Sequence, residues 1–291
     1  MKKISVIIPT RNRKEILFSN LNKLLEMNDD EMEILVYDDA SRADYSEEIK
    51  SLFGPVRFYR TDKHVGYCTL RNLLVKASQG EFVINLDDDS CFASKEDYFK
   101  AKESAFGFLK IGIMGFKIIK NNKVQFPSDI KDGLYYYNTF MGCGYLFNRS
   151  LFLEIGGIDK DFFRQGEEKD LAIRFLAAGY PVILNTNVTV LHEESALERD
   201  HQFIHAYAFR NDFFFYVKYF PAYIAIFFVL KCILSHSIFC LSKLWIRAYF
   251  IGLCMIFRDF RKFIAKMSPL TLKILNKYLN LRKPLEIGEL P

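Results

Sequence analysis

The sequence lacks the short motifs that mark several common enzyme classes. It contains no G-x-G-x-x-G and no G-x-x-x-x-G-K-[ST] pattern, which counts against dinucleotide-dependent dehydrogenases and P-loop NTPases. It also contains no G-x-S-x-G elbow, which counts against an α/β-hydrolase. No internal repeat or low-complexity linker divides the 291 residues, a length that suits one large α/β domain, alone or with an appendage.

Cysteine pairing and excess charge are also limited. The six cysteines form no C-x-x-C pair and show no zinc-like spacing, so we expect reduced, mostly packed thiols in a cytosolic protein. The apolar run over residues 4–8 is too short for a signal peptide and ends at Pro9. The formal net charge of +5 is too small to indicate a nucleic-acid partner, although it suits an anionic membrane surface.

Apolar runs alternate with helical stripes through the first 90 residues. We predict strands over residues 3–8, 33–37, 56–59 and 82–86, and helices over 14–27, 44–53 and 66–80. This alternation predicts an α/β fold in which a mostly parallel sheet is covered by helices on both faces. Further along we expect mixed strands and loops over 111–148, helices over 150–155 and 167–179, and short strands over 181–184 and 188–191.

Three polar clusters follow predicted strands: Thr10-Arg11, Asp38-Asp39 and Asp87 to Asp89. Because ligands of open α/β sheets bind beyond the carboxyl ends of the strands, we expect all three clusters at one edge. Three consecutive carboxylates repel one another, and a divalent cation such as Mg²⁺ or Mn²⁺ with a bound phosphate offsets that repulsion. A solvated acidic turn is the alternative interpretation, but the second acidic strand end favours the metal.

Asp38-Asp39 and Arg71 each have a nucleotide-binding interpretation and an ordinary structural one. Asp38-Asp39 can accept hydrogen bonds from a pyrimidine ring or from ribose hydroxyls, or it forms a turn or helix cap, and the nearby run of three Asp favours the nucleotide interpretation. Arg71, on the helix that Gly66 opens, can contact a phosphate or a base edge, or it is a surface arginine that pairs with a neighbouring acid.

Further candidate residues lie in the second half of the chain. Glu167, Glu168 and Asp170 fall in the first turn of a predicted helix, where the helix dipole favours carboxylates. One of them can act as a general base that removes a proton from an attacking hydroxyl. Capping explains one such acid more easily than three. His192 can ligate a metal or orient a phosphate, or it is a packed or capping histidine.

Taken together, these segments resemble family 2 glycosyltransferases, which have the GT-A fold. The resemblance follows the family's order over roughly residues 3–200, through Ser5 to Arg13, Asp38 to Ser41, Arg71-Asn72, Asp87 to Asp89 and Gly166 to Leu171. It implies an inverting transferase that uses a nucleotide-diphosphate sugar and a divalent cation, Mn²⁺ or Mg²⁺.

The resemblance also implies roles for individual residues. Asp87 and Asp89 match the outer positions of the D-x-D motif, which holds metal and diphosphate, and His192 matches a metal- or phosphate-contacting histidine of some members. The family's usual Glu-Asp motif reads Glu167-Glu168 here, so we expect Glu168 as the base, with Glu167 and Asp170 as alternatives. The implied nucleotide-sugar-binding residues are Pro9, Thr10, Arg11, Arg13, Asp38, Asp39, Arg71, Asp87 and Asp88.

The last third of the chain is strongly apolar. We expect a catalytic domain over residues 1–210, with a nucleotide-sugar-binding half (1–110) and an acceptor-side half (111–210), and a hydrophobic helical extension over 211–291. Residues 222–240 are apolar enough to span a membrane, but Lys231 at their centre favours helices that lie at the interface, with Arg258, Arg261 and Lys262 facing headgroups. A helical subdomain packed on the sheet is the alternative.

The resemblance implies a glycosyltransferase, and together with the apolar extension it implies one at the cytoplasmic face of a membrane that extends a glycan on a polyprenyl-linked acceptor, as in surface polysaccharide assembly. We expect no nucleic-acid partner. A second hypothesis is a haloacid-dehalogenase-type phosphatase, which also places D-x-D after a strand but expects Thr or Val where Cys91 stands. A third is a sugar-nucleotide-binding or scaffold protein that has lost catalysis, which Glu168 in place of Asp suggests.

Overall fold

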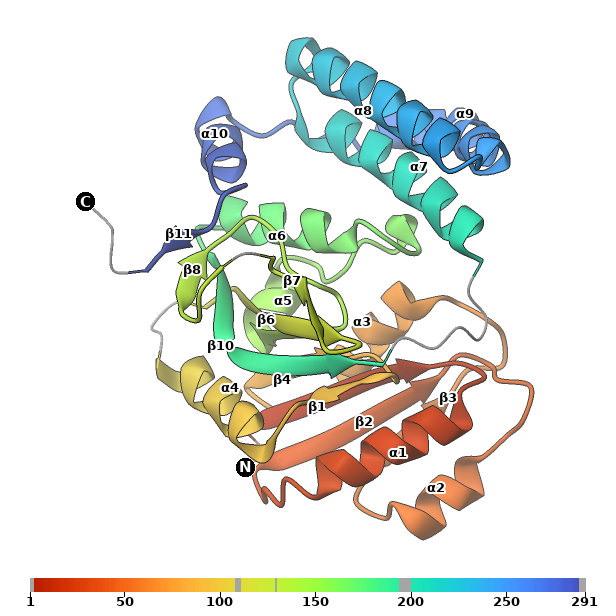
Figure 1. The fold of residues 1–291 in the computed structure, drawn as a ribbon. Coiled ribbons are helices and arrows are strands. Elements are labelled where there is room, and N and C mark those ends of the chain that lie inside the picture. Colours follow the sequence, from red (N-terminus) through yellow and green to blue (C-terminus); the bar gives the residue numbers. More distant parts are fainter. Residues whose placement is uncertain (1–2, 108–110, 129, 194–199, 288–291) are drawn as a thin grey trace.

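The computed structural model describes residues 3–107, 111–128, 130–193 and 200–287, and its first part alternates strands and helices as the sequence predicts (Figure 1). The strands are β1 (Ile4–Thr10), β2 (Met32–Asp38), β3 (Arg57–Arg60) and β4 (Phe82–Leu86), and the helices are α1 (Lys14–Leu25), α2 (Ser46–Leu52) and α3 (Tyr67–Ala77). The four strands pair in parallel in the order β4-β1-β2-β3, so their carboxyl ends lie at one edge of the sheet.

The remaining strands extend the same sheet with mostly antiparallel pairs. They are β5 (Ser90–Phe92), β6 (Ile113–Lys120), β7 (Lys123–Phe126), β8 (Leu134–Tyr136), β9 (Gly144–Asn148), β10 (Val182–His192) and β11 (Leu285–Glu286). Strand β9 is antiparallel to both β4 and β6 and so joins the two halves, whereas β6 and β10 are parallel. The predicted α/β class is confirmed, and the complete sheet is mixed.

Strand β10 and helix α4 differ from the prediction. The two short strands expected over residues 181–184 and 188–191 are one strand, β10, whose register against β6 shifts between Asn185 and Thr189. Polar residues at this shift hide the continuity of the strand in the sequence. In the structure, the Thr186 hydroxyl hydrogen-bonds to the carbonyl oxygens of Lys131 and Gly133 instead of facing solvent. Helix α4 (Lys95–Gly107) was not predicted, because its charged sequence carries little apolar periodicity.

Alternate side chains of the central strands pack against two separate cores. Ile4, Val6 and Ile8 of β1 join a core that includes residues of α1, α2 and α4. Ile7 points to the other face, where residues of α3, α5 (Arg149–Glu154) and α6 (Glu167–Ala177) complete a second core. This alternation confirms that helices cover both faces of the sheet.

The chain after residue 200 forms a helical unit beside α6. Its helices are α7 (His201–Tyr219), α8 (Ala222–Ser242), α9 (Ile246–Ala265) and α10 (Leu272–Asn280). A third core joins Phe162 and Ile173, which precede this unit in the chain, to aromatic residues of α7 and to α9. Helix α7 runs through the boundary expected at residues 210 and 211, so one continuous helix crosses that boundary.

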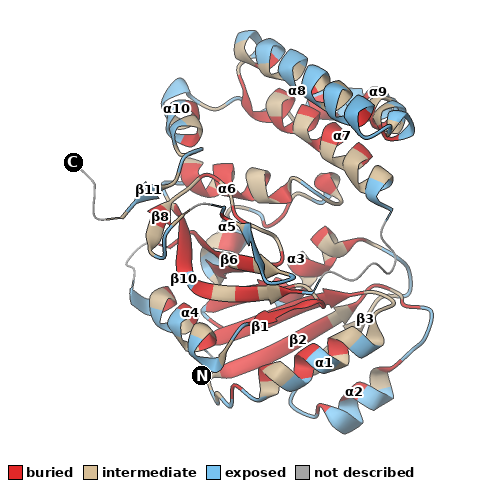
Figure 2. Ribbon diagram, in the orientation of Figure 1, coloured by how far each residue is buried: buried red, intermediate tan, exposed pale blue. Residues whose placement is uncertain are grey.

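Helices α8 and α9 lie outside α7 and expose much of their surface (Figures 1 and 2). Helix α8 is long and apolar enough to cross a membrane, and little of it is buried by the rest of the chain. Most of its exposed large apolar residues are three or four positions from the next, as one face of a helix requires, and the set is Tyr223, Ile226, Phe227, Leu230, Leu234, Ile238, Phe239 and Leu241.

Candidate active site

The carboxyl ends of β1, β2 and β4 bring the three predicted polar clusters together. Thr10 pairs with Asp38 in the strand register, and the backbone N–H of Asp39 donates to the Thr10 carbonyl oxygen over 2.9 Å. The Thr10 hydroxyl donates to Asp88 Oδ2 over 2.8 Å, which connects β1 to the acidic run after β4. The predicted convergence at one sheet edge is confirmed.

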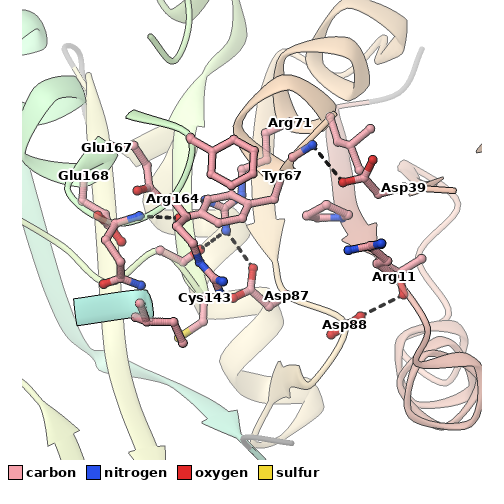
Figure 3. A pocket seen from close by; sticks show the side chains of 18 of the residues that line it. Arg11, Asp39, Tyr67, Arg71, Asp87, Asp88, Cys143, Arg164, Glu167 and Glu168 are labelled. Carbon is pink, nitrogen blue, oxygen red and sulfur yellow. Dashed lines mark hydrogen bonds and ion pairs between the residues drawn. The ribbon is translucent and has the colours of Figure 1, made fainter. Parts of the chain in front are cut away.

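A cavity of about 500 Å³ opens at this edge (Figure 3). Figure 3 shows Asp87 and Asp88 on one side of the cavity and Glu167 and Glu168, from the start of α6, on the other. The structure thus brings most of the predicted residues to one cavity, whose lining includes Pro9, Thr10, Arg11, Arg13, Asp39, Arg71, Asp87, Asp88, Glu167, Glu168 and His192.

Positive charge within the acidic run comes from the chain itself. Arg13 Nη1 lies 2.9 Å from Asp88 Oδ1 and 3.1 Å from Asp89 Oδ2. Burial raises the pKa of Asp88 to about 6, although the Arg13 charge opposes this shift. The carboxylate repulsion that the sequence suggested is therefore relieved in part by a guanidinium group.

Asp87, Asp89 and His192 gather donor atoms as a metal site requires. One donor atom of each lies within 4.8 Å of the other two. His192 pairs with Ser90 in the β10–β5 register, which places its ring beside the acidic run. Its Nε2 atom is buried 3.3 Å from Asp89 Oδ1 and makes no hydrogen bond with the described residues. This donor set fits a divalent cation.

Arg71 is buried between the two sides of the cavity. Its Nη2 atom lies 2.7 Å from Asp87 Oδ1 and donates to the Gly142 carbonyl oxygen over 3.0 Å. Its Nη1 atom lies 3.1 Å from Glu167 Oε1. With 3% of its surface exposed, Arg71 is not the surface arginine that one interpretation expected. The guanidinium holds two acids in place, and its contact with a nucleotide stays a prediction.

Glu168 combines access to the cavity with an environment that disfavours its charge. Gly142 passes so close that a Cβ atom there would stand 2.6 Å from Glu168 Oε1. Burial, followed by the neighbouring Glu167 carboxylate, raises the pKa of Glu168 to about 8. Burial also raises the pKa of Glu167, against the charge of Arg71. A carboxylate with a raised pKa is well matched to removing a hydroxyl proton near neutral pH.

Asp170 does not reach the cavity. Its Oδ1 atom accepts hydrogen bonds from Lys218 over 2.7 Å and from Tyr219 over 2.5 Å, and its Oδ2 atom pairs with Arg174 over 2.6 Å. The side chain is fully buried under α7. Asp170 therefore fastens α6 to α7, and the structure offers no support for it as the base.

Asp38 and Asp39 have different environments. The Asp38 carboxylate is enclosed, where it accepts from the Ser41 backbone N–H over 3.1 Å and pairs with Arg60 over 2.5 Å. Asp39 lines the cavity and accepts from the backbone N–H groups of Val65 and Gly66 over 2.7 and 2.9 Å. Both acids order the loops around the cavity, and only Asp39 borders it directly.

Sequence reasoning did not name several lining residues individually. Phe163 and Gln165 precede α6 with backbone φ angles of 57° and 68°, and the Phe163 ring lies 2.8 Å from the place a Cβ of Gly66 would occupy. The sequence leads us to expect only that the loops over residues 120–145 and 157–166 contribute to the shape of the pocket, and these two side chains lie in the second loop. The other lining residues not named individually include His64, Tyr67, Gln125, Cys143, Arg164, His201 and Ile204.

Comparisons with known sequences agree with this geometry. The family model for glycosyl transferase family 2 matches residues 5–100. An uncharacterized glycosyltransferase of Haemophilus influenzae is 32% identical over 89 residues, which are 31% of this chain and 30% of that protein. The poly(ribitol-phosphate) beta-N-acetylglucosaminyltransferase TarP of Staphylococcus aureus is 34% identical over 125 residues, 40% of this chain and 38% of that protein. The matches thus span well under half the length of these two relatives.

A solved structure shows the same fold over nearly the whole chain. The mannosyltransferase PcManGT of Pyrobaculum calidifontis, in complex with GDP-Man and Mn²⁺, has a TM-score of 0.61 at 16% identity and covers 96% of this chain and 79% of that one. The resemblance to family 2 glycosyltransferases and the GT-A fold are therefore confirmed. The comparisons favour neither the phosphatase nor the scaffold hypothesis.

Proposed function

We propose that the protein transfers a sugar from a nucleotide-diphosphate sugar to an acceptor hydroxyl with inversion at the anomeric carbon. The observation that carries this proposal is a single cavity bordered by Asp87 and Asp88 on one side and Glu168 on the other. PcManGT, which shares the fold, is solved with a nucleotide sugar, and this supports the donor class.

The donor binds along the edge formed by β1, β2 and β4. Asp39 borders the nucleoside end, and the segment from Pro9 to Arg13 borders the pyrophosphate. Arg11 Nε is buried without a hydrogen-bond partner among the described residues, so a donor of the guanidinium group remains for phosphate oxygens.

Asp87, Asp89 and His192 would hold the divalent cation, Mn²⁺ or Mg²⁺. A bound cation of this kind neutralises negative charge that develops on the departing nucleoside diphosphate. Arg13 and Arg71 already balance part of the acidic run, so they keep these carboxylates in position before any ligand arrives.

Glu168 is the general base. It removes the proton from the acceptor hydroxyl, and the oxygen attacks the anomeric carbon from the face opposite the leaving diphosphate. Glu167 is held in an ion pair with Arg71, so we assign the proton to Glu168. Gly142 leaves room for the Glu168 carboxylate, because any larger residue would occupy that space.

The acceptor is a lipid-linked glycan at the cytoplasmic face of a membrane, as in surface polysaccharide assembly. His201 and Ile204, at the start of α7, line the catalytic cavity. Helices α8 and α9, which pack on α7, expose large apolar residues such as Phe257, 78% exposed, and Tyr223, 68% exposed. Patches of this kind mark interaction surfaces, and the amphipathic helix α9 suits the membrane interface.

The proposed function is tested first by donor binding and then by transfer. A panel of nucleotide sugars with Mn²⁺ is screened by thermal shift, because a ligand that binds the folded state raises its stability. With the donor found, Glu168→Gln is expected to lower turnover by about 10²–10⁴-fold with unchanged donor affinity. Glu154→Gln, an exposed acid on α5, serves as the control. Normal turnover in Glu168→Gln would reject the assignment of the base.

A further inference from the structure

A second group of metal-binding residues lies outside the catalytic cavity, where α7 packs against α8. Asp212 of α7 and Cys232 and His236 of α8 place one donor atom each within 4.8 Å of the other two. His236 Nε2 is 3.1 Å from Asp212 Oδ2. This group shares no residue with the one formed by Asp87, Asp89 and His192.

Helix geometry explains why these residues meet. Cys232 and His236 are four positions apart, so they lie on one face of α8. His205 and Asp212 are seven positions apart on α7 and also share a face. The antiparallel packing of the two helices then brings both faces together.

Outer contacts orient the donors. His236 Nδ1 lies 3.2 Å from His205 Nε2, so the second ring nitrogen of His236 has a partner of its own. Lys169 Nζ lies 2.6 Å from Asp212 Oδ1, which leaves Oδ2 directed at His236. Partners of this kind fix the ring and carboxylate orientation in metal sites.

Aromatic rings surround much of the site. The His236 ring stacks on Phe209 with centroids 4.7 Å apart, and the His205 ring stacks on Phe239 at 4.5 Å. Cys232 is buried, with 6% of its surface exposed. A sulfur, a nitrogen and an oxygen donor in such a place suit Zn²⁺ rather than the harder Mg²⁺.

We propose that Asp212, Cys232 and His236 bind one Zn²⁺-type ion that joins α7 to α8. The ion takes the position between His236 Nε2 and Asp212 Oδ2, and water completes a four-coordinate shell. The neutral His236 imidazole keeps its single proton on Nδ1, which donates a hydrogen bond to His205 Nε2. The thiol proton of Cys232 is released to solvent. The site also contacts α6 through Lys169, the residue that follows Glu168.

This site was not predicted from the cysteine pattern. The zinc-like spacings sought in the sequence involve cysteines that lie close together in the chain. Here one ligand comes from a neighbouring helix, twenty residues before the cysteine. Only the packing of α7 on α8 brings the three donors together.

The proposal is tested with Co²⁺, which reports its ligands by absorption. The full-length chain carrying Asp89→Ala, which weakens the catalytic cation site, is purified in detergent, stripped with a chelator and titrated. We expect one equivalent of Co²⁺ to give tetrahedral visible bands and a thiolate charge-transfer band. Cys232→Ser is expected to abolish the charge-transfer band, and His236→Gln to weaken Co²⁺ binding at least about tenfold.

Cys240→Ser is the matched control, because Cys240 is a buried cysteine two turns further along α8. It is expected to retain the band. Absence of the band in the parent chain would overturn the proposal. A band that survives Cys232→Ser would also overturn it, because another thiol, such as Cys143 of the catalytic cavity, would then be the ligand. Zn²⁺ should also raise the melting temperature of the parent and of Cys240→Ser; an equal rise in His236→Gln would contradict the site. Neither measurement uses sugar transfer, so the outcome is independent of the proposed function.

Discussion

Arg71 Nη1 lies 3.1 Å from Glu167 Oε1, and both side chains of this ion pair are at most 4% exposed. The same guanidinium reaches Asp87 at the end of β4, so one side chain connects the sheet edge to α6. Removing one partner of a buried pair leaves the other charge uncompensated, which makes the pair sensitive to substitution.

We expect Arg71→Met to lower the free energy of unfolding by about 3–5 kcal/mol, because Glu167 and Asp87 lose their common partner. Urea unfolding followed by circular dichroism measures this change. Lys50→Met, which breaks an exposed pair with Glu47, is the control and should leave the midpoint unchanged. Equal effects of both substitutions would show that Arg71 does not organise the site.

Gly142→Ala should reduce turnover more than stability. The new Cβ atom would stand 2.6 Å from Glu168 Oε1, so the carboxylate must move away from the acceptor. A misplaced catalytic group costs on the order of 10²-fold in rate. Gly107→Ala is the control, since no atom lies within 4 Å of its added Cβ. Steady-state kinetics with saturating donor make the comparison, and unchanged kcat in Gly142→Ala would contradict the crowding argument.

The activity should depend on pH through Glu168. The base must be ionised, so kcat/KM is expected to fall as pH drops below the raised pKa of about 8 and to level off above it. A pH–rate profile measures this, and a profile flat down to about pH 6 would argue against Glu168 as the base.

The same shift has the opposite effect on stability. The folded state holds the Glu168 proton more tightly than the unfolded state, whose group titrates near 4.5. Stability contributed by this group is therefore present at low pH and is lost as pH rises from about 4.5 to about 8. Glu168→Gln should remove that part of the slope in a series of urea melts at different pH.

Chelation should abolish transfer, and Mn²⁺ should restore it. His192→Gln removes an imidazole nitrogen from the donor set, and we expect Mn²⁺ affinity in the presence of nucleoside diphosphate to fall at least about tenfold. Isothermal titration calorimetry measures this affinity. His201→Gln changes a histidine that lines the same cavity and lies outside this donor set, so it should retain Mn²⁺ binding.

Membrane binding should depend on the exposed faces of α8 and α9. Phe227→Ser and Phe257→Ser each remove a large side chain that is at least 64% exposed. Burying such a side chain contributes about 1.5–3 kcal/mol, so each substitution is expected to lower partitioning into anionic vesicles by about tenfold or more. Leu52→Ser on α2, which is equally exposed, is the control in the sedimentation assay. Unchanged partitioning of all three variants would reject these faces as the attachment surface.

The parallel part of the fold was predictable because each buried strand is a short apolar run that stops at a polar residue. The bounds of β4, Phe82–Leu86, agree with the prediction, and the acids after it lie where the strand order places them. This same logic located most of the cavity, since strand ends need only local sequence to be recognised.

The remaining features depend on contacts between distant segments. The first turn of α6 contains three acids, and the sequence alone does not show which of them α7 will cover. Asp170 is excluded from the cavity by Lys218 and Tyr219, which lie 48 and 49 residues further along the chain. Similarly, nothing in the pattern of α7 showed that His201 would line the cavity.

The chain returns to the catalytic sheet after the outer helices. Strand β11 pairs with β8, and the Asn138 side chain donates to the Tyr278 carbonyl oxygen over 3.0 Å. Before the outer helices, Asp170 of α6 accepts a hydrogen bond from Lys218 of α7. The chain is thus anchored to the sheet domain both before and after helices α8 and α9. If these helices bind a surface, the direction in which the cavity faces that surface is set by this packing and not by the length of a linker.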